Sequence, residues 1–144
     1  MTNIVKFFYT SLLAVLLCLP TKAQQANNAF QANLYNQEYD VFLNINFADM
    51  IESIPGHELY GPLPGYLGKT TSSFYWLILS AEQDKETATL QMVNDYGSED
   101  LTATLTQTSD STFVLTQGKG SIIKLPYEKK WQKLPKSLEF KKRR

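Results

Sequence analysis

The sequence predicts an all-β protein, in which an antiparallel meander of about seven to eight short strands forms a small barrel or a sandwich. Apolar and polar residues alternate with a period of two through most of the chain, which is the pattern of half-buried strands. Between residues 74 and 127 these segments are joined by short polar turns of hairpin length. No stretch of helical period is long enough to supply the crossovers of a parallel sheet.

The first 23 residues have the three parts of a secretory signal peptide. Met1–Lys6 carries a basic side chain, Phe7–Leu19 is an apolar run, and Pro20–Ala23 ends in small residues suited to cleavage. The apolar run is shorter than the roughly 20 residues that a membrane-spanning helix needs. We therefore expect cleavage near Ala23, export to the periplasm or beyond, and no membrane span in the mature chain. An uncleaved anchor and lipidation at Cys18, the single cysteine, are the alternatives.

Residues 24–38 differ in composition from the rest of the chain, being rich in Gln, Asn and Ala. Phe30 and Leu34 are spaced as on one face of a helix, so we expect a partly ordered N-terminal lead-in, either a short helix or a disordered segment. Residues 39–144 are expected to form a single β-domain. Without a cysteine after cleavage, this domain must be stabilised by packing rather than by disulfides.

Seven segments have the pattern of strands. They are Tyr39–Phe47, Phe74–Ala81, Thr87–Asn94, Leu101–Gln107, Thr112–Thr116, Ser121–Tyr127 and Ser137–Phe140. Phe74–Ala81 is apolar on both faces, so one face is expected to point into the core and the other to be covered. Ile54–Gly68 contains three prolines and four glycines and is expected to be largely loop. Because this loop also contains apolar residues, we expect it to cover the second face of Phe74–Ala81 or to cross an open end of the barrel.

The meander resembles the barrels of the lipocalins and of related small periplasmic proteins. The likeness is one of architecture, since no family motif accompanies it. A barrel of eight strands encloses space either for side chains or for one small ligand. Tyr60, Tyr66, Trp76 and Leu90 are the candidates for lining such a cavity, and packing in a filled core is the alternative interpretation.

Charge is distributed unevenly along the chain. Between Gln24 and Gly118 there are 12 acidic residues and two lysines, whereas residues 119–144 hold ten basic and two acidic residues. This C-terminal basic block is either a face for anionic partners or the neighbour of acidic strands that neutralise it. Its candidate binding residues are Lys129, Lys130, Trp131, Lys133, Lys141, Lys142, Arg143 and Arg144. Nucleic acid is not the partner expected of an exported protein, although lysines interleaved with aromatics suit it chemically.

No catalytic or metal-binding constellation stands out. The only histidine, His57, lies in a loop, and a zinc site needs three or four ligands. The acidic turns 82–86 and 95–100 do not have the spacing of a calcium loop, and Gly97-Ser98 lacks the flanking pattern of a nucleophile elbow. We therefore expect no cofactor, no metal and no enzymatic activity.

These observations lead to two functional hypotheses and a third, weaker one. The first is an exported, non-enzymatic binding protein of a bacterial envelope, whose ligand is small and apolar or is an anionic envelope component. The alternative is a protein–protein module, such as an inhibitor of a cell-wall hydrolase, that presents the loops Pro55–Lys69 and Asp95–Asp100. An enzyme of unfamiliar type, built around His57, is the third.

Overall fold

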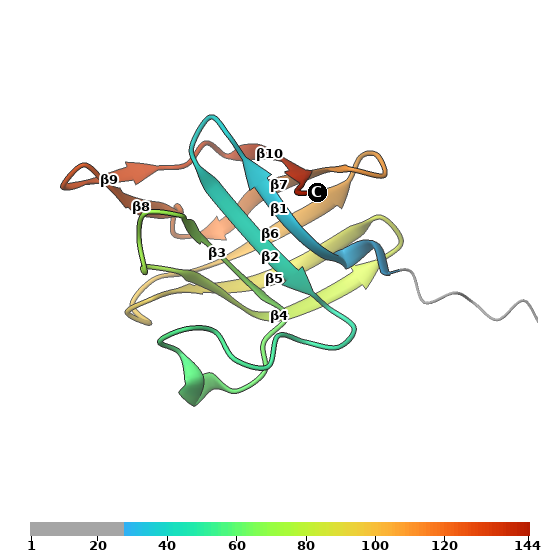
Figure 1. The fold of residues 1–144 in the computed structure, drawn as a ribbon, viewed down its shortest axis with the longest axis horizontal. Coiled ribbons are helices and arrows are strands. Elements are labelled where there is room, and N and C mark those ends of the chain that lie inside the picture. The colour runs from blue at the N-terminus through green and yellow to red at the C-terminus, as the bar shows by residue number, and fades with distance from the viewer. Residues whose placement is uncertain (1–27) are drawn as a thin grey trace, which may run out of the picture.

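The computed structural model describes residues 28–144, so the predicted signal peptide and its cleavage site near Ala23 lie outside the described residues. The described chain forms a closed barrel in which every neighbouring pair of strands is antiparallel (Figure 1). Its strands are β1 (Gln31–Asn36), β2 (Val41–Asn46), β3 (Gly65–Lys69), β4 (Trp76–Asp84), β5 (Thr87–Asn94), β6 (Asp100–Gln107), β7 (Thr112–Gly120) and β10 (Ser137–Lys142). The all-β prediction is confirmed, and of the two architectures it is the barrel that forms.

The barrel begins earlier in the chain than the sequence suggested. A 3₁₀ turn, η1 (Asn28–Phe30), leads directly into β1, which pairs along its whole length with β2 and closes the barrel against β10. The helical spacing of Phe30 and Leu34 was therefore misleading, because Leu34 is an inward-facing strand residue with no exposed surface. Residues 31–38 are part of the barrel wall and its first hairpin rather than a lead-in.

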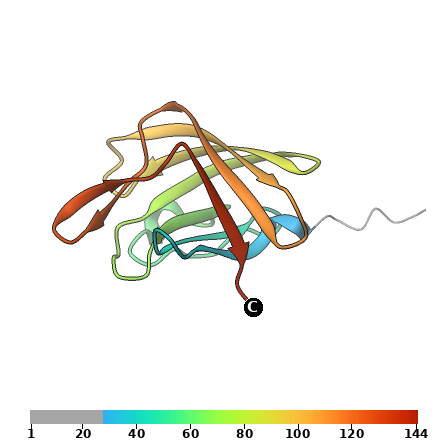
Figure 2. The same cartoon turned by 90° about the horizontal axis from the view of Figure 1, so that it is seen from above.

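The segment Ser121–Tyr127 is not a barrel strand, and this corrects the sequence-based prediction. Its strand part, β8 (Lys124–Tyr127), pairs with β9 (Lys130–Lys133) in a separate two-stranded sheet. β7 continues through the predicted turn as far as Gly120, and β10 takes the place beside it, with Leu138 opposite Leu115. The β8–β9 hairpin consequently projects from one end of the barrel (Figures 1 and 2).

Large side chains fill the barrel interior. The largest fully buried members of this core, each less than 2% exposed, are Trp76, Phe113, Phe140, Leu34, Leu43, Leu67, Ile78, Leu90, Met92 and Leu105. They come from every barrel strand, since alternate residues of each strand point inward. Burial of this apolar surface stabilises the fold in the absence of disulfides.

A smaller cluster lies on the outside of the barrel. The loop between β2 and β3, which includes the 3₁₀ turn η2 (Glu58–Tyr60), packs Ile54 and Leu63 against Leu77 of β4 and Val93 of β5. The apolar loop thus covers the outer face of β4, as the two-sided apolar pattern of Phe74–Ala81 predicted. A close polar contact between His57 Nε2 and Asp95 Oδ1 ties the loop to the turn after β5.

Candidate binding face at the β8–β9 hairpin

The β8–β9 hairpin presents two different faces. Lys124 lies directly opposite Lys133, and Pro126 lies opposite Trp131, so these four side chains share one face. The other face places Leu125 in the barrel core, where it is fully buried. The hairpin is therefore anchored through one face and offers lysines and an indole ring on the other.

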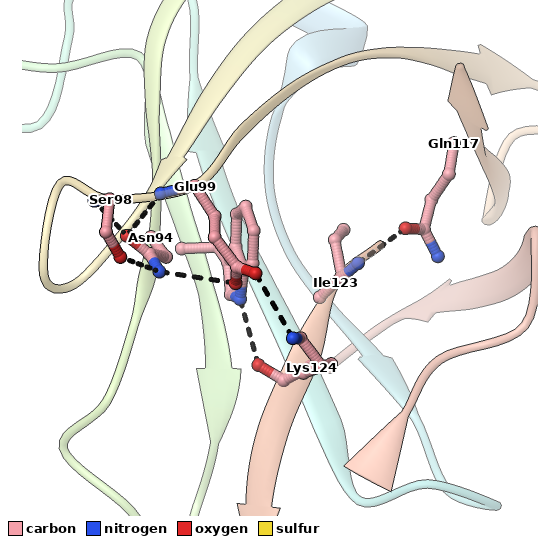
Figure 3. A network of polar contacts seen from close by, with 7 residues as sticks. Asn94, Ser98, Glu99, Gln117, Ile123 and Lys124 are labelled. Atoms are coloured by element: carbon pink, nitrogen blue, oxygen red, sulfur yellow. Dashed lines mark hydrogen bonds and ion pairs between the residues drawn. The ribbon is translucent and has the colours of Figure 1, made fainter. Parts of the chain in front are cut away.

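Hydrogen bonds from the barrel fix the position of the hairpin (Figure 3). Within the core, Trp76 Nε1 donates to the carbonyl oxygen of Lys124 at 3.0 Å. Gln117, only 7% exposed, accepts from the backbone nitrogen of Ile123 at 2.7 Å and donates to the carbonyl oxygen of Pro135 at 3.0 Å. Because these bonds are buried or partly buried and reach both ends of the segment 121–136 between β7 and β10, the hairpin has a defined orientation.

The turn between β5 and β6 faces the hairpin and is organised by one buried amide. Asn94, 3% exposed, accepts at its Oδ1 from the backbone nitrogens of Ser98 at 2.9 Å and Glu99 at 3.2 Å. Glu99 Oε1 in turn accepts a hydrogen bond from the ammonium of Lys124 at 3.1 Å (Figure 3). The turn and the hairpin are thus held together by a partly exposed ion pair, whose free-energy contribution is expected to be about 1 kcal/mol or less.

An aromatic pocket opens between these two elements. Phe74 forms its base at 7% exposure, and its ring meets those of Tyr96 and Trp131 edge-on, with centroid distances of 5.1 and 4.9 Å. Tyr96 and Trp131 are 72% and 51% exposed. The hollow has a volume of about 110 Å³ and is lined by Phe74, Asn94, Tyr96, Ser98, Glu99, Lys124 and Trp131. We call this hollow the aromatic pocket.

Several lysines of the hairpin that carries Trp131 have no carboxylate partner. Among residues 28–144, Lys124–Glu99 is the one pair in which a lysine or arginine lies within 4.0 Å of a carboxylate. Lys129, Lys130 and Lys133 are exposed and have no such partner. Most of the basic block is therefore not neutralised by direct ion pairs with the acidic strands, so its charge remains open to solvent and to a ligand.

The structure divides the predicted anionic-partner residues into two groups. Lys129, Lys130, Trp131 and Lys133 lie on the hairpin, before β10, whereas Lys141, Lys142, Arg143 and Arg144 follow at its far end. Figures 1 and 2 show the hairpin and the C-terminus well apart. In the second group the Arg143 guanidinium stacks 4.0 Å from the ring centroid of Tyr35. The two groups are thus separate surfaces, not one patch.

The predicted cavity-lining residues do not converge. Trp76 and Leu90 are fully buried in the filled core. Tyr66 lies on the outer face of β3 and packs against the outer cluster, and Tyr60 is exposed on the covering loop. The interpretation of these four residues as one pocket is therefore wrong, since the strand period sends neighbours such as Tyr66 and Leu67 to opposite faces.

The aromatic pocket itself was only partly visible in the sequence. Trp131 was among the predicted residues, but Tyr96 and Glu99 were not assigned to a ligand site with it. The sequence feature that could have indicated the site is Tyr96, an aromatic residue in an otherwise polar turn. Its partner across the pocket is 35 positions away in the chain, so no local pattern connects the two.

Comparisons with known proteins do not assign a family. No family model, curated protein or solved structure matches the chain. Residues 28–144 contain no helix long and apolar enough to cross a membrane, and no group of three or more His, Cys, Asp or Glu placed to hold a metal ion. The function must therefore be argued from the geometry of the candidate site.

Proposed function

We propose that this chain is an exported, non-enzymatic binding protein of a bacterial envelope, and that it binds an anionic envelope component. The binding surface in this proposal is the hairpin together with the aromatic pocket. Lys124, Trp131 and Lys133 lie on the hairpin face beside the pocket, and Lys129 and Lys130 lie at the hairpin tip. The observation that carries the proposal is the pocket of exposed aromatic rings beside lysines that have no carboxylate partner. Exposed aromatic and basic residues on a rigid support are typical of recognition surfaces.

The filled core favours an anionic ligand over a small apolar one. Trp76, Phe113 and Phe140 occupy the barrel interior, each with less than 2% exposure. An apolar ligand inside the barrel would have to displace side chains of this size, which costs packing energy. A ligand on the hairpin face requires no such rearrangement, because the pocket is already formed.

The proposal is tested by binding to immobilised lipopolysaccharide, polygalacturonate and phosphatidylglycerol vesicles at increasing salt. We expect binding to at least one of these probes that weakens steeply with salt, as contacts between lysines and anions do. The variant K129Q/K130Q/K133Q is expected to lose it. The matched control, K141Q/K142Q/R143Q, removes equal charge at the far end of β10 and is expected to retain binding. Binding that disappears only in the control variant would assign the activity to the C-terminus instead.

Export is tested on the protein purified from its own host. The mass of the protein recovered from the periplasm or medium is expected to correspond to residues 24–144. A mass that still includes residues 1–23 would contradict the proposed processing.

A second candidate function is supported by the covering loop. Leu59 is fully exposed and Tyr60 is 46% exposed at η2, while the loop that presents them is fixed by the His57–Asp95 pair. A rigid loop with an exposed apolar tip is a feature of inhibitors that enter a partner's cleft. Inhibition of a purified cell-wall hydrolase, lost in L59S/Y60S and kept in K129Q/K130Q/K133Q, would favour this function over the first.

A further inference from the structure

We infer that the aromatic pocket binds one ring of an acidic saccharide, stacked on Trp131 or Tyr96, with the acid group of the sugar at Lys133. The inference rests on the proposed function and names the chemical class of its ligand. Three features of the pocket support it, namely the arrangement of its rings, its polar groups and its charge.

The arrangement of the rings leaves aromatic faces free for a ligand. Tyr96 and Trp131 both contact Phe74 at steep interplanar angles, 72° and 71°, and are joined through it. Neither ring is covered, since each exposes half of its surface or more. An exposed aromatic face carries partial negative charge and attracts the polarised C–H bonds that line one side of a sugar ring.

Polar groups at the edge of the pocket suit the hydroxyls of a sugar. Ser98 and Glu99 both line the hollow, and Asn94 holds the turn that carries them through three hydrogen bonds to Ser98 and Glu99 at 2.9 to 3.2 Å. A carboxylate and a hydroxyl fixed in this way are preorganised to bond to neighbouring hydroxyls of one ring.

The charges near the aromatic pocket favour an acidic sugar over a cationic ligand, which is the other class that such pockets bind. Three aromatic rings beside a carboxylate are also suited to a quaternary ammonium group. Here, however, the Glu99 carboxylate is already paired with Lys124 at 3.1 Å. Lys133 stands directly across the hairpin from Lys124 and has no carboxylate within 4.0 Å. The two charges that line the pocket therefore balance each other, and the unpaired Lys133 next to Lys124 favours an anion over a cation at its edge.

The experiment is a titration followed by tryptophan fluorescence and by amide chemical shifts. The probes are oligosaccharides of galacturonic, glucuronic and sialic acid, their carboxyl-reduced counterparts, polyphosphate and tetramethylammonium. We expect at least one acidic oligosaccharide to bind, with shifts centred on residues 94–99 and 124–133. Its reduced counterpart and K133Q should each bind about tenfold more weakly.

Two aromatic variants test the stacking itself. Y96S changes an exposed turn residue and W131L changes the hairpin, and each should weaken saccharide binding about tenfold, which is more than it weakens binding of polyphosphate. The control Y60S, on the covering loop, should bind as the unmodified protein does. Saccharide binding that is unaffected in both Y96S and W131L would overturn the inference, even if W131L alone proved unstable.

The outcomes separate the inference from the proposed function. If the hairpin lysines bind polyphosphate or vesicles in a salt-dependent way and no acidic oligosaccharide binds, the inference fails and the proposed function stands. If tetramethylammonium or the reduced sugars bind better than the acidic ones, the assignment of an anionic ligand is wrong. If no anionic probe binds at all, both fail.

Discussion

The ammonium of Lys69 lies 4.4 Å from the ring centroid of Tyr127, so the end of β3 is in direct contact with the tip of the hairpin. Lys69 is only 2% exposed, and its Nζ also donates to the carbonyl oxygen of Tyr39 at 2.7 Å. A buried ammonium needs such partners, because desolvation of its charge is otherwise costly. The contact thus stabilises both the buried lysine and the position of the hairpin.

The cation–π contact predicts a difference between two substitutions at Tyr127. Y127L removes the aromatic face from the Lys69 ammonium and is expected to lower the free energy of unfolding by about 1 kcal/mol. Y127F keeps the face and is expected to differ from the unmodified protein by less than about 0.5 kcal/mol. Urea unfolding of both variants measures this difference. Equal losses in the two would show that the contact contributes nothing.

Gln117 is predicted to be one of the most sensitive polar residues of the barrel. Q117M preserves the approximate size of the side chain but removes its bonds to Ile123, Leu134 and Pro135, which leaves buried backbone groups unpaired. We expect a loss of roughly 2–4 kcal/mol in the free energy of unfolding. Hydrogen exchange should locate the loss at residues 121–136. The matched control is Q91M, on an exposed strand position, which is expected to change stability by less than about 0.5 kcal/mol.

Substitutions in the turn of the β8–β9 hairpin are predicted to increase the stability of the protein. Glu128 and Lys129 form its two central residues with φ of 46° and 64°, a left-handed conformation that favours asparagine and glycine. E128N/K129G is therefore expected to raise the free energy of unfolding by about 1 kcal/mol. Thermal unfolding measures the change, with K129Q as the control for the lost charge. A destabilised double variant would contradict this assignment of the turn.

Acid is predicted to weaken the first hairpin through Asp40. The Tyr35 hydroxyl donates to Asp40 Oδ1 at 2.6 Å, and Thr70 Oγ1 donates to Oδ2 at 2.8 Å. The hydrogen bond from Tyr35, followed by the one from Thr70, holds the pKa of Asp40 below its ordinary value of 3.8, against an opposing effect of burial. Because the folded state binds the proton more weakly than the unfolded state does, this contribution to stability is complete above the ordinary pKa. It is lost as the pH falls through the folded-state pKa.

D40N is the variant that measures this contribution. Its difference in unfolding free energy from the unmodified protein is expected to be constant above about pH 5 and to shrink below about pH 4. D110N, at an exposed turn, serves as the control. A difference that does not change between these pH values would show that the Tyr35–Asp40 contact makes no pH-dependent contribution.

The sequence alone determined the fold class and most of the barrel wall. Alternation in segments such as Thr87–Asn94 and Leu101–Gln107 identified strands correctly, because half-buried strands expose every second residue whatever their neighbours are. Two strands of the barrel wall were missed, and so was β9 of the hairpin. β1 has few apolar residues, and β3 contains two glycines within a segment that reads as loop. At Gly65 the glycine is required, since a Cβ there would collide with the carbonyl oxygen of Asn44 on β2.

Only the tertiary structure decided where the candidate site lies. The local sequence pattern identified Ser121–Tyr127 as extended. It did not predict that β10, rather than this segment, pairs with β7, because strand pairing depends on long-range packing. For the same reason the sequence placed Trp76 and Tyr66 in one pocket, although they lie on opposite sides of the wall. The aromatic pocket joins residues from three separate segments, near positions 74, 96 and 131. Its existence depends on barrel closure, which brings the β5–β6 turn against a hairpin that the core residue Trp76 holds in place.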